Sequence, residues 1–149
     1  MMGVKLVNYL FTLLALLAGF GVAMQSQING ELGKRIGPLD ASLISFTVGT
    51  VVLFFLVLLY GKGGIPSIGS VPKWQLIGGL FGAFFVTVIT LCVPRIGVSL
   101  TLLIAIAGQI IMGAVINHYG LFGAAAMPIS VQKLAAIGLM LIAVALYNA

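Results

Sequence analysis

The sequence contains very little charge. Seven of its 149 residues are Lys or Arg and two are Asp or Glu, which is 6% of the chain. An average soluble domain carries about 25% charged residues, so this chain cannot cover the surface of a soluble globular protein. A nucleic-acid-binding protein is also excluded. Despite the net charge of +5, the basic residues are spread along an apolar chain and form no basic patch.

Residues that carry enzyme chemistry are nearly absent as well. A single cysteine, Cys92, excludes an intrachain disulfide framework and a cysteine-based metal site. One histidine forms no histidine cluster, and two acidic residues form no catalytic carboxylate pair. Hydrolytic, metal-dependent and acid–base enzymes need such groups together. We therefore expect no catalytic residue, no metal, no cofactor and no enzyme activity.

The sequence is rich in long hydrophobic segments. Hydrophobic residues make up 62% of the chain, and the few charges divide it into long uncharged runs. About 20 apolar residues in a helix cross the ~30 Å hydrocarbon core of a bilayer. The sequence therefore predicts an all-α integral membrane protein, with residues 1–149 as a single transmembrane domain. Its five helices are expected at about 6–29, 40–60, 74–94, 98–116 and 129–147.

The distribution of basic residues hardly favours one orientation of the chain in the membrane. With five helices, the N-terminal side of the membrane receives four of them and the opposite side three: Lys5, Lys62, Lys73 and Lys133 against Lys34, Arg35 and Arg95. An excess of Lys and Arg in short loops normally sets the orientation. Either the chain inserts in one weakly biased orientation, or it inserts both ways and pairs as an antiparallel dimer. Two oppositely oriented copies would form a ten-helix inverted-repeat transporter.

A short pattern occurs twice in the chain. Arg35-Ile36-Gly37 precedes Ser42, and Arg95-Ile96-Gly97 precedes Thr101. The pattern indicates either an internal repeat that relates the second and fourth helices, or a chance match. Chance matches are common in membrane sequences because they use few residue types.

Several polar side chains lie within the apolar runs. Gln25 and Asn29 are four residues apart, so they share one face of the first helix. Polar groups in a membrane tend to face a bundle interior or a cavity. They can line a substrate cavity or join helices by hydrogen bonds, and the sequence leaves both readings open. As candidate cavity-lining residues we predict Gln25, Asn29, Ser45, Thr87, Thr90 and Gln109.

The two acidic residues fall in the expected first loop. Glu31 and Asp40 can form a solvated cluster with Lys34 and Arg35. Alternatively, Glu31 lies at the mouth of the cavity as a cation or proton site. Asp40 is also a candidate cap of the second helix.

Asn117 and His118 lie at the expected end of the fourth helix. His118 is either an interfacial loop residue or part of a proton-linked gate, because imidazole changes charge near neutral pH. Together with Glu31, these two residues are the candidates for coupling or gating.

Longer segments of the sequence resemble a known family. They include Gln25–Gly33, Gly37-Pro38, Ser45–Thr50, Gly108–Ile110 and Ile116–Gly123. Together they are similar to the YdcZ (DUF606) family of the bacterial drug/metabolite transporter superfamily. The resemblance implies a five-helix half of a ten-helix transporter fold in the bacterial inner membrane. It also implies Asp where this chain has Asn117, so a titratable site would be missing here.

These observations predict a small secondary-active transporter that exports a small metabolite or drug-like compound. It would work by alternating access as an antiparallel homodimer, or with a paired homologous half. Its partners would be that second subunit, the lipid bilayer and a small molecule, with no nucleic acid. The alternative is a non-transporting accessory or structural membrane protein that binds a larger membrane complex or lipid.

Overall fold

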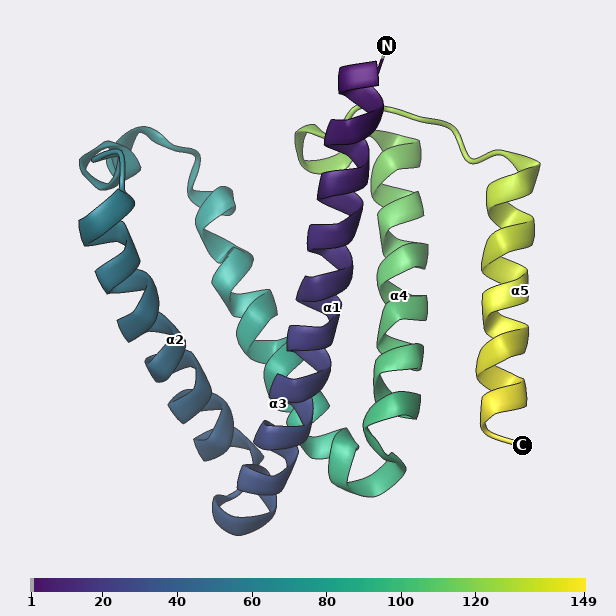
Figure 1. The fold of residues 1–149 in the computed structure, drawn as a ribbon, viewed down its shortest axis with the longest axis horizontal. Coiled ribbons are helices and arrows are strands. Elements are labelled where there is room, and N and C mark those ends of the chain that lie inside the picture. The colour runs from purple at the N-terminus through teal and green to yellow at the C-terminus, as the bar shows by residue number, and fades with distance from the viewer. Residues whose placement is uncertain (1) are drawn as a thin grey trace. The chain divides into compact units, whose positions relative to one another are not determined.

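The computed structural model describes the backbone of residues 2–149 and the side chains of residues 8–149. Over this range the chain is helical and contains no strand. The α-helices are α1 (Met2–Ile36), α2 (Pro38–Tyr60), α3 (Gly78–Ile96), α4 (Val98–Tyr119) and α5 (Val131–Tyr147) (Figure 1). Short 3₁₀ helices occupy Ile65–Ser70, Lys73–Ile77 and Leu121–Gly123.

Four helical segments are long and apolar enough to cross a membrane: Asn8–Ile36, Pro38–Tyr60, Lys73–Ile96 and Val98–Tyr119. The fifth helix, α5, is equally apolar but has 17 residues, which is the lower limit of the roughly 17–25 residues used by membrane helices. The expected all-α membrane class is confirmed. Assembly into a ten-helix unit stays a prediction.

The first helix is longer than the sequence predicts. It continues to Ile36, so Glu31, Lys34 and Arg35 lie on α1 and not in a loop. Asn29-Gly30 does not end the helix, which stops where Gly37-Pro38 follows Ile36, and the basic residues in its last turn interact favourably with the helix dipole. The expected cap of α2 is also wrong. Gly37 is the N-cap residue, and Asp40 lies in the first turn without a capping hydrogen bond.

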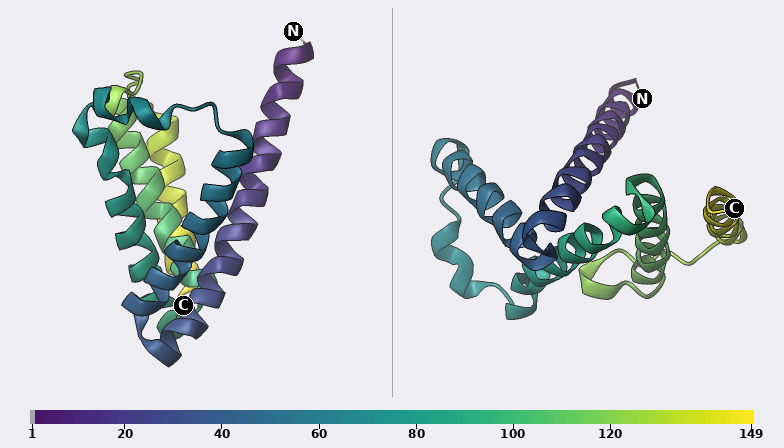
Figure 2. Two further views of the ribbon diagram at one scale, coloured as in Figure 1. Left: turned by 90° about the vertical axis from the view of Figure 1, so that its left-hand side faces the viewer. Right: turned by 90° about the horizontal axis from the view of Figure 1, so that it is seen from below.

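Residues 2–95 form one compact unit that contains α1, α2 and α3 as far as Arg95. The helices α1 and α2 meet at Gly37 and diverge from there (Figures 1 and 2). Near this meeting point, α1 also packs tightly on α3. A Cβ atom at Gly30 would lie 2.7 Å from Val93 Cγ1, and one at Gly33 would lie 2.6 Å from Thr90 Cγ2. Glycine is therefore what allows the two backbones to approach here.

Residues 96–149 form the second unit. The helix α4 continues to Tyr119, which places Asn117 and His118 in its last turn and not beyond its end. The following loop folds back onto this turn, where Met127 N donates to Asn117 O (2.7 Å). The helix α5 begins at Val131, two residues later than expected, and Ser130 caps it.

The two Arg-Ile-Gly segments have the same local structure. In each, a single glycine separates two helices, with φ 95° and ψ 150° at Gly37 and φ 80° and ψ 158° at Gly97. These dihedral angles are open to glycine and strained for other residues. The next helix starts with the same hydrogen bond, from Ala41 N to Gly37 O and from Thr101 N to Gly97 O. The structural register therefore pairs Thr101 with Ala41, one residue before the Ser42 suggested by the sequence.

Most large apolar side chains are exposed. In the described part of the chain, the buried apolar residues are Ala41, Val86, Ile89, Val93 and Ala107. All but Ala107 belong to the first unit, near the convergence of α1, α2 and α3. Such an apolar exterior suits a surface that contacts lipid or another membrane protein.

Two of the basic residues counted on the N-terminal side are Lys5 and Lys133. Lys133 lies on a helix and not in a loop, because it is the third residue of α5. The side chain of Lys5 is not among those that the structure describes.

Candidate functional site

A polar cluster lies where α1 and α2 begin to diverge. The Asn29 side chain is buried, and its Nδ2 donates a hydrogen bond to Ser45 Oγ on α2 (3.1 Å). Both residues come from strongly apolar helices, where an isolated amide would lose its hydrogen bonds to water. The bond therefore satisfies one polar group with another and fixes α1 against α2 at this level.

Gln25 lies one helical turn before Asn29 on the same face of α1. Its side chain is exposed and forms no hydrogen bond with any described residue. A primary amide offers two N–H donors and one carbonyl acceptor. Gln25 therefore presents a complete set of hydrogen-bonding groups within an apolar helix.

Three hollows in the first unit meet at Gln25. A hollow of about 460 Å³ at the α1–α2 fork is lined by Gln25, Asn29 and Ser45 together with apolar residues. A second hollow, of about 230 Å³, is lined by Gln25, Ser45 and Thr50, among others. A smaller one, about 40 Å³, lies between α1 and α3 beside Gln25, Ser26 and Asn29. Polar groups thus converge on the fork with space around them.

The remaining predicted cavity residues lie elsewhere. Thr90 is 1% exposed, and its methyl group packs towards Gly33 on α1. Its Oγ1 is buried without a hydrogen-bond partner among the described residues. Thr87 is half-buried on α3 and lines none of the three hollows. Gln109 is exposed on α4, in the other unit. Their role in substrate binding stays a prediction.

Two residues at the fork were not among the sequence candidates. Ser26 is buried and donates to Val22 O (2.7 Å), so its hydroxyl is satisfied within α1. Thr50 lines the hollow of about 230 Å³ at the fork. Its hydroxyl in a membrane-length apolar helix, five residues beyond Ser45, is the signal that could have identified it.

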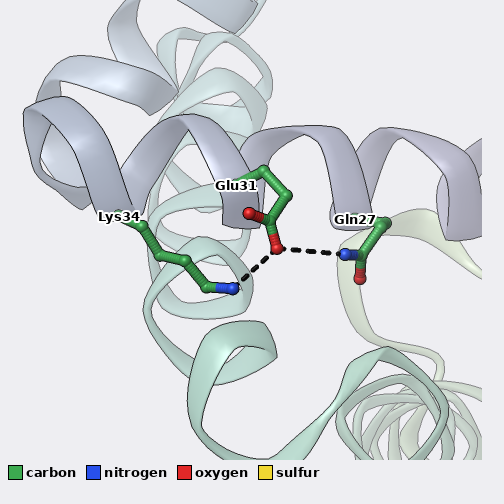
Figure 3. A network of polar contacts seen from close by, with 3 residues as sticks. All are labelled: Gln27, Glu31 and Lys34. Atoms are coloured by element: carbon green, nitrogen blue, oxygen red, sulfur yellow. Dashed lines mark hydrogen bonds and ion pairs between the residues drawn. The ribbon is translucent and has the colours of Figure 1, made fainter.

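Glu31 belongs to a different surface of α1. Its Oε1 accepts hydrogen bonds from Lys34 Nζ (2.6 Å) and Gln27 Nε2 (3.3 Å) (Figure 3). Gln27 is two residues from Gln25, which turns it by roughly 200° around the helix. About half of the Glu31 and Lys34 side chains is exposed. The carboxylate is therefore paired with a cation away from the polar fork.

Asn117 and His118 hold the loop that follows α4. Asn117 accepts Met127 N through its backbone oxygen, and His118 Nδ1 accepts a hydrogen bond from Ile129 N (3.2 Å). The imidazole also contacts the Tyr119 ring edge-on, with centroids 4.7 Å apart. This geometry requires Nδ1 without a proton. His118 thus helps to hold this loop against the last turn of α4, and its role in coupling or gating stays a prediction.

Neither unit brings together a group that could hold a metal ion, within the part of the chain that the structure describes. The site chemistry at the fork consists of amides, hydroxyls and space, with apolar walls. Such an arrangement can bind a small molecule by hydrogen bonds and apolar contact.

Comparison with known proteins gives two matches. The family described as "Putative inner membrane exporter, YdcZ" matches residues 10–146. The protein named "Inner membrane protein YdcZ" from Escherichia coli (strain K12) is 30% identical over 107 residues, which is 68% of this chain and 70% of that protein. No solved structure matches the chain.

Proposed function

Since the chain belongs to the YdcZ family and is a multi-pass protein of the inner membrane, we propose that it is a small secondary transporter that exports its substrate through a polar fork formed by α1 and α2. The family description concerns export and not catalysis. The fork consists of Gln25, Asn29, Ser45 and Thr50.

The unpaired amide of Gln25 carries this proposal. An amide that faces an apolar environment without a hydrogen bond costs roughly 2–7 kcal/mol. A chain that only had to pack its helices would gain stability from an apolar residue at this position. Gln25 is explained if the fork holds water or substrate in the working protein, since either one supplies the missing hydrogen bonds.

The chemistry of the fork suggests the type of substrate. Its polar groups are uncharged, while Glu31 is paired with Lys34 on another face of α1. The walls are otherwise apolar. We propose a small amphipathic compound that offers hydrogen-bond donors or acceptors and no strong charge.

The working unit in this proposal is an antiparallel dimer, formed with a second copy or with a homologous half. The nearly balanced basic residues support insertion in both orientations. The exposed apolar helices offer surface for a second subunit. Two inverted five-helix units can alternate access by rocking around a site near the middle of the membrane.

The experiment compares export by cells that produce the chain with export by cells that produce Gln25→Leu. Metabolites in the medium and in the cells are measured by untargeted mass spectrometry. We expect at least one compound to accumulate in the medium with the original chain and to stay inside with Gln25→Leu. Gln27→Leu is the matched control, because Gln27 faces away from the fork and bonds Glu31.

The accessory-protein alternative predicts a different result. If Gln25 serves only to join subunits or a larger complex, Gln25→Leu will change assembly, and no exported compound will distinguish it from the control. Equal export by both variants would reject the fork as the substrate site.

A further inference from the structure

A separate groove lies within the second unit, between α4 and α5. Its volume is about 390 Å³. The space arises where small residues face each other, with Gly113 and Ala114 on α4 and Ala136 on α5. The loop residue Met127 contributes to one end. None of the fork residues belongs to this groove.

The groove has one polar end and one apolar end. Asn117 lies in the last turn of α4, and Lys133 lies in the first turn of α5, so the two line the same end. Residues farther from this loop, such as Ile110 and Met140, make the other end apolar. A membrane-spanning helix pair places such a loop at the membrane surface and the apolar end within the hydrocarbon core.

Lys133 has no acidic partner in its unit. Residues 96–149 contain neither Asp nor Glu. The ammonium therefore stands at the mouth of an apolar groove without a side-chain counter-ion, and an anionic group is the complementary ligand.

We propose that the α4–α5 groove binds an anionic phospholipid. One acyl chain fills the apolar part, the phosphate contacts Lys133 Nζ, and the Asn117 amide hydrogen-bonds to the ester region. The order of these groups along a phospholipid, with charge at the surface and hydrocarbon below, matches the order of groups along the groove. The inference does not depend on transport through the fork.

The test titrates the full chain in detergent with two lipids that have identical oleoyl chains, phosphatidylglycerol and phosphatidylcholine. Native mass spectrometry measures the bound lipid. One Lys near an anionic lipid surface increases the affinity about five-fold. We therefore expect phosphatidylglycerol to bind about five-fold more tightly than phosphatidylcholine. Lys133→Gln should remove this preference and Lys133→Arg should keep it. Lys73→Gln, at another exposed lysine, should also keep it.

A second pair of variants tests the groove itself. Ala136→Phe fills the groove and should weaken the binding of both lipids, whereas Ala135→Phe, on a neighbouring exposed position outside the lining, should not. Equal binding of the two lipids by the original chain would overturn the proposal. So would a preference that survives Lys133→Gln. If Ala136→Phe instead reduced dimer formation and left lipid binding unchanged, the occupant would be a second copy, and the lipid proposal would be wrong.

Discussion

Asn29 Nδ2 lies 3.1 Å from Ser45 Oγ, and this hydrogen bond joins α1 to α2 at the point where the two helices begin to diverge. One turn earlier, Gln25 has the same functional group and no protein partner among the described residues. The two amides that the sequence could not separate therefore differ in their surroundings. One joins helices, and the other is available for a ligand.

Replacing Asn29 should lower stability, whereas replacing Gln25 should not. Hydrogen bonds between membrane helices contribute about 0.6 kcal/mol on average and at most about 1.7 kcal/mol. We expect Asn29→Ala to reduce the free energy of unfolding by an amount in this range. Gln25→Ala should change it little, because no protein hydrogen bond is lost and water in the fork satisfies the amide of the original chain. Reversible unfolding in mixed micelles measures both. Equal losses would mean that Gln25 is also a structural residue.

The contact between Gly33 and Thr90 should tolerate no added methyl group. Gly33→Ala places a Cβ atom 2.6 Å from Thr90 Cγ2, and overpacking of this kind costs about 1–3 kcal/mol. Thermal unfolding should show the loss. Gly21→Ala is the control, since no atom lies within 4 Å of its added Cβ.

A double variant tests the same contact from the other side. Thr90→Ser removes the methyl group that Gly33→Ala would meet, so the pair should be more stable than Gly33→Ala alone. If the stability change of the double variant equalled the sum of the changes in the two single variants, the close approach of α1 and α3 at this point would be contradicted.

The hydroxyl of Thr90 should be dispensable. Its Oγ1 is buried and lacks a partner, and an unsatisfied buried polar group costs about 1–3 kcal/mol. Thr90→Val keeps the shape and removes that group, so the variant should be at least as stable as the original chain and should export the same compound. A stable Thr90→Val variant that no longer exports would show that Thr90 contacts the substrate after all.

His118 should hold the loop between α4 and α5. Replacing it with Phe removes the acceptor for Ile129 N, and the backbone around Ile129 should exchange its amide hydrogens faster at constant pH. Tyr119→Phe, which keeps a ring beside His118, serves as the control. Unchanged exchange in His118→Phe would mean that Met127 N and Asn117 O hold the loop without the imidazole.

Much of the fold follows from the sequence because the bilayer demands it. Long uncharged runs have to form helices, since no other arrangement satisfies the backbone in lipid. The spacing of Gln25 and Asn29 already places them on one face of α1. The sequence does not place the end of that helix correctly, because Glu31 and Lys34 look like loop residues in a chain with few charges. On the helix they form an ion pair at a spacing of three residues.

The sequence could not show which polar residues meet. The partner of Asn29 depends on the register between α1 and α2, and the burial of Thr90 depends on the approach of α3 to Gly33. Contacts between helices decide both, and they are not encoded in spacing along one helix. The register of the repeated Arg-Ile-Gly segment, in contrast, can be read from the sequence, because Ala41 and Thr101 each lie four residues after the repeated glycine, Gly37 or Gly97.

The measurement that tests the proposed antiparallel dimer most directly is the orientation of the C-terminus in cells. One reporter that is active only in the cytoplasm and one that is active only in the periplasm are fused to it in parallel. An antiparallel homodimer predicts comparable signals from both reporters, because about half of the chains insert each way. A signal from one reporter alone would contradict the antiparallel homodimer and require either a parallel dimer or an oppositely oriented partner from another gene.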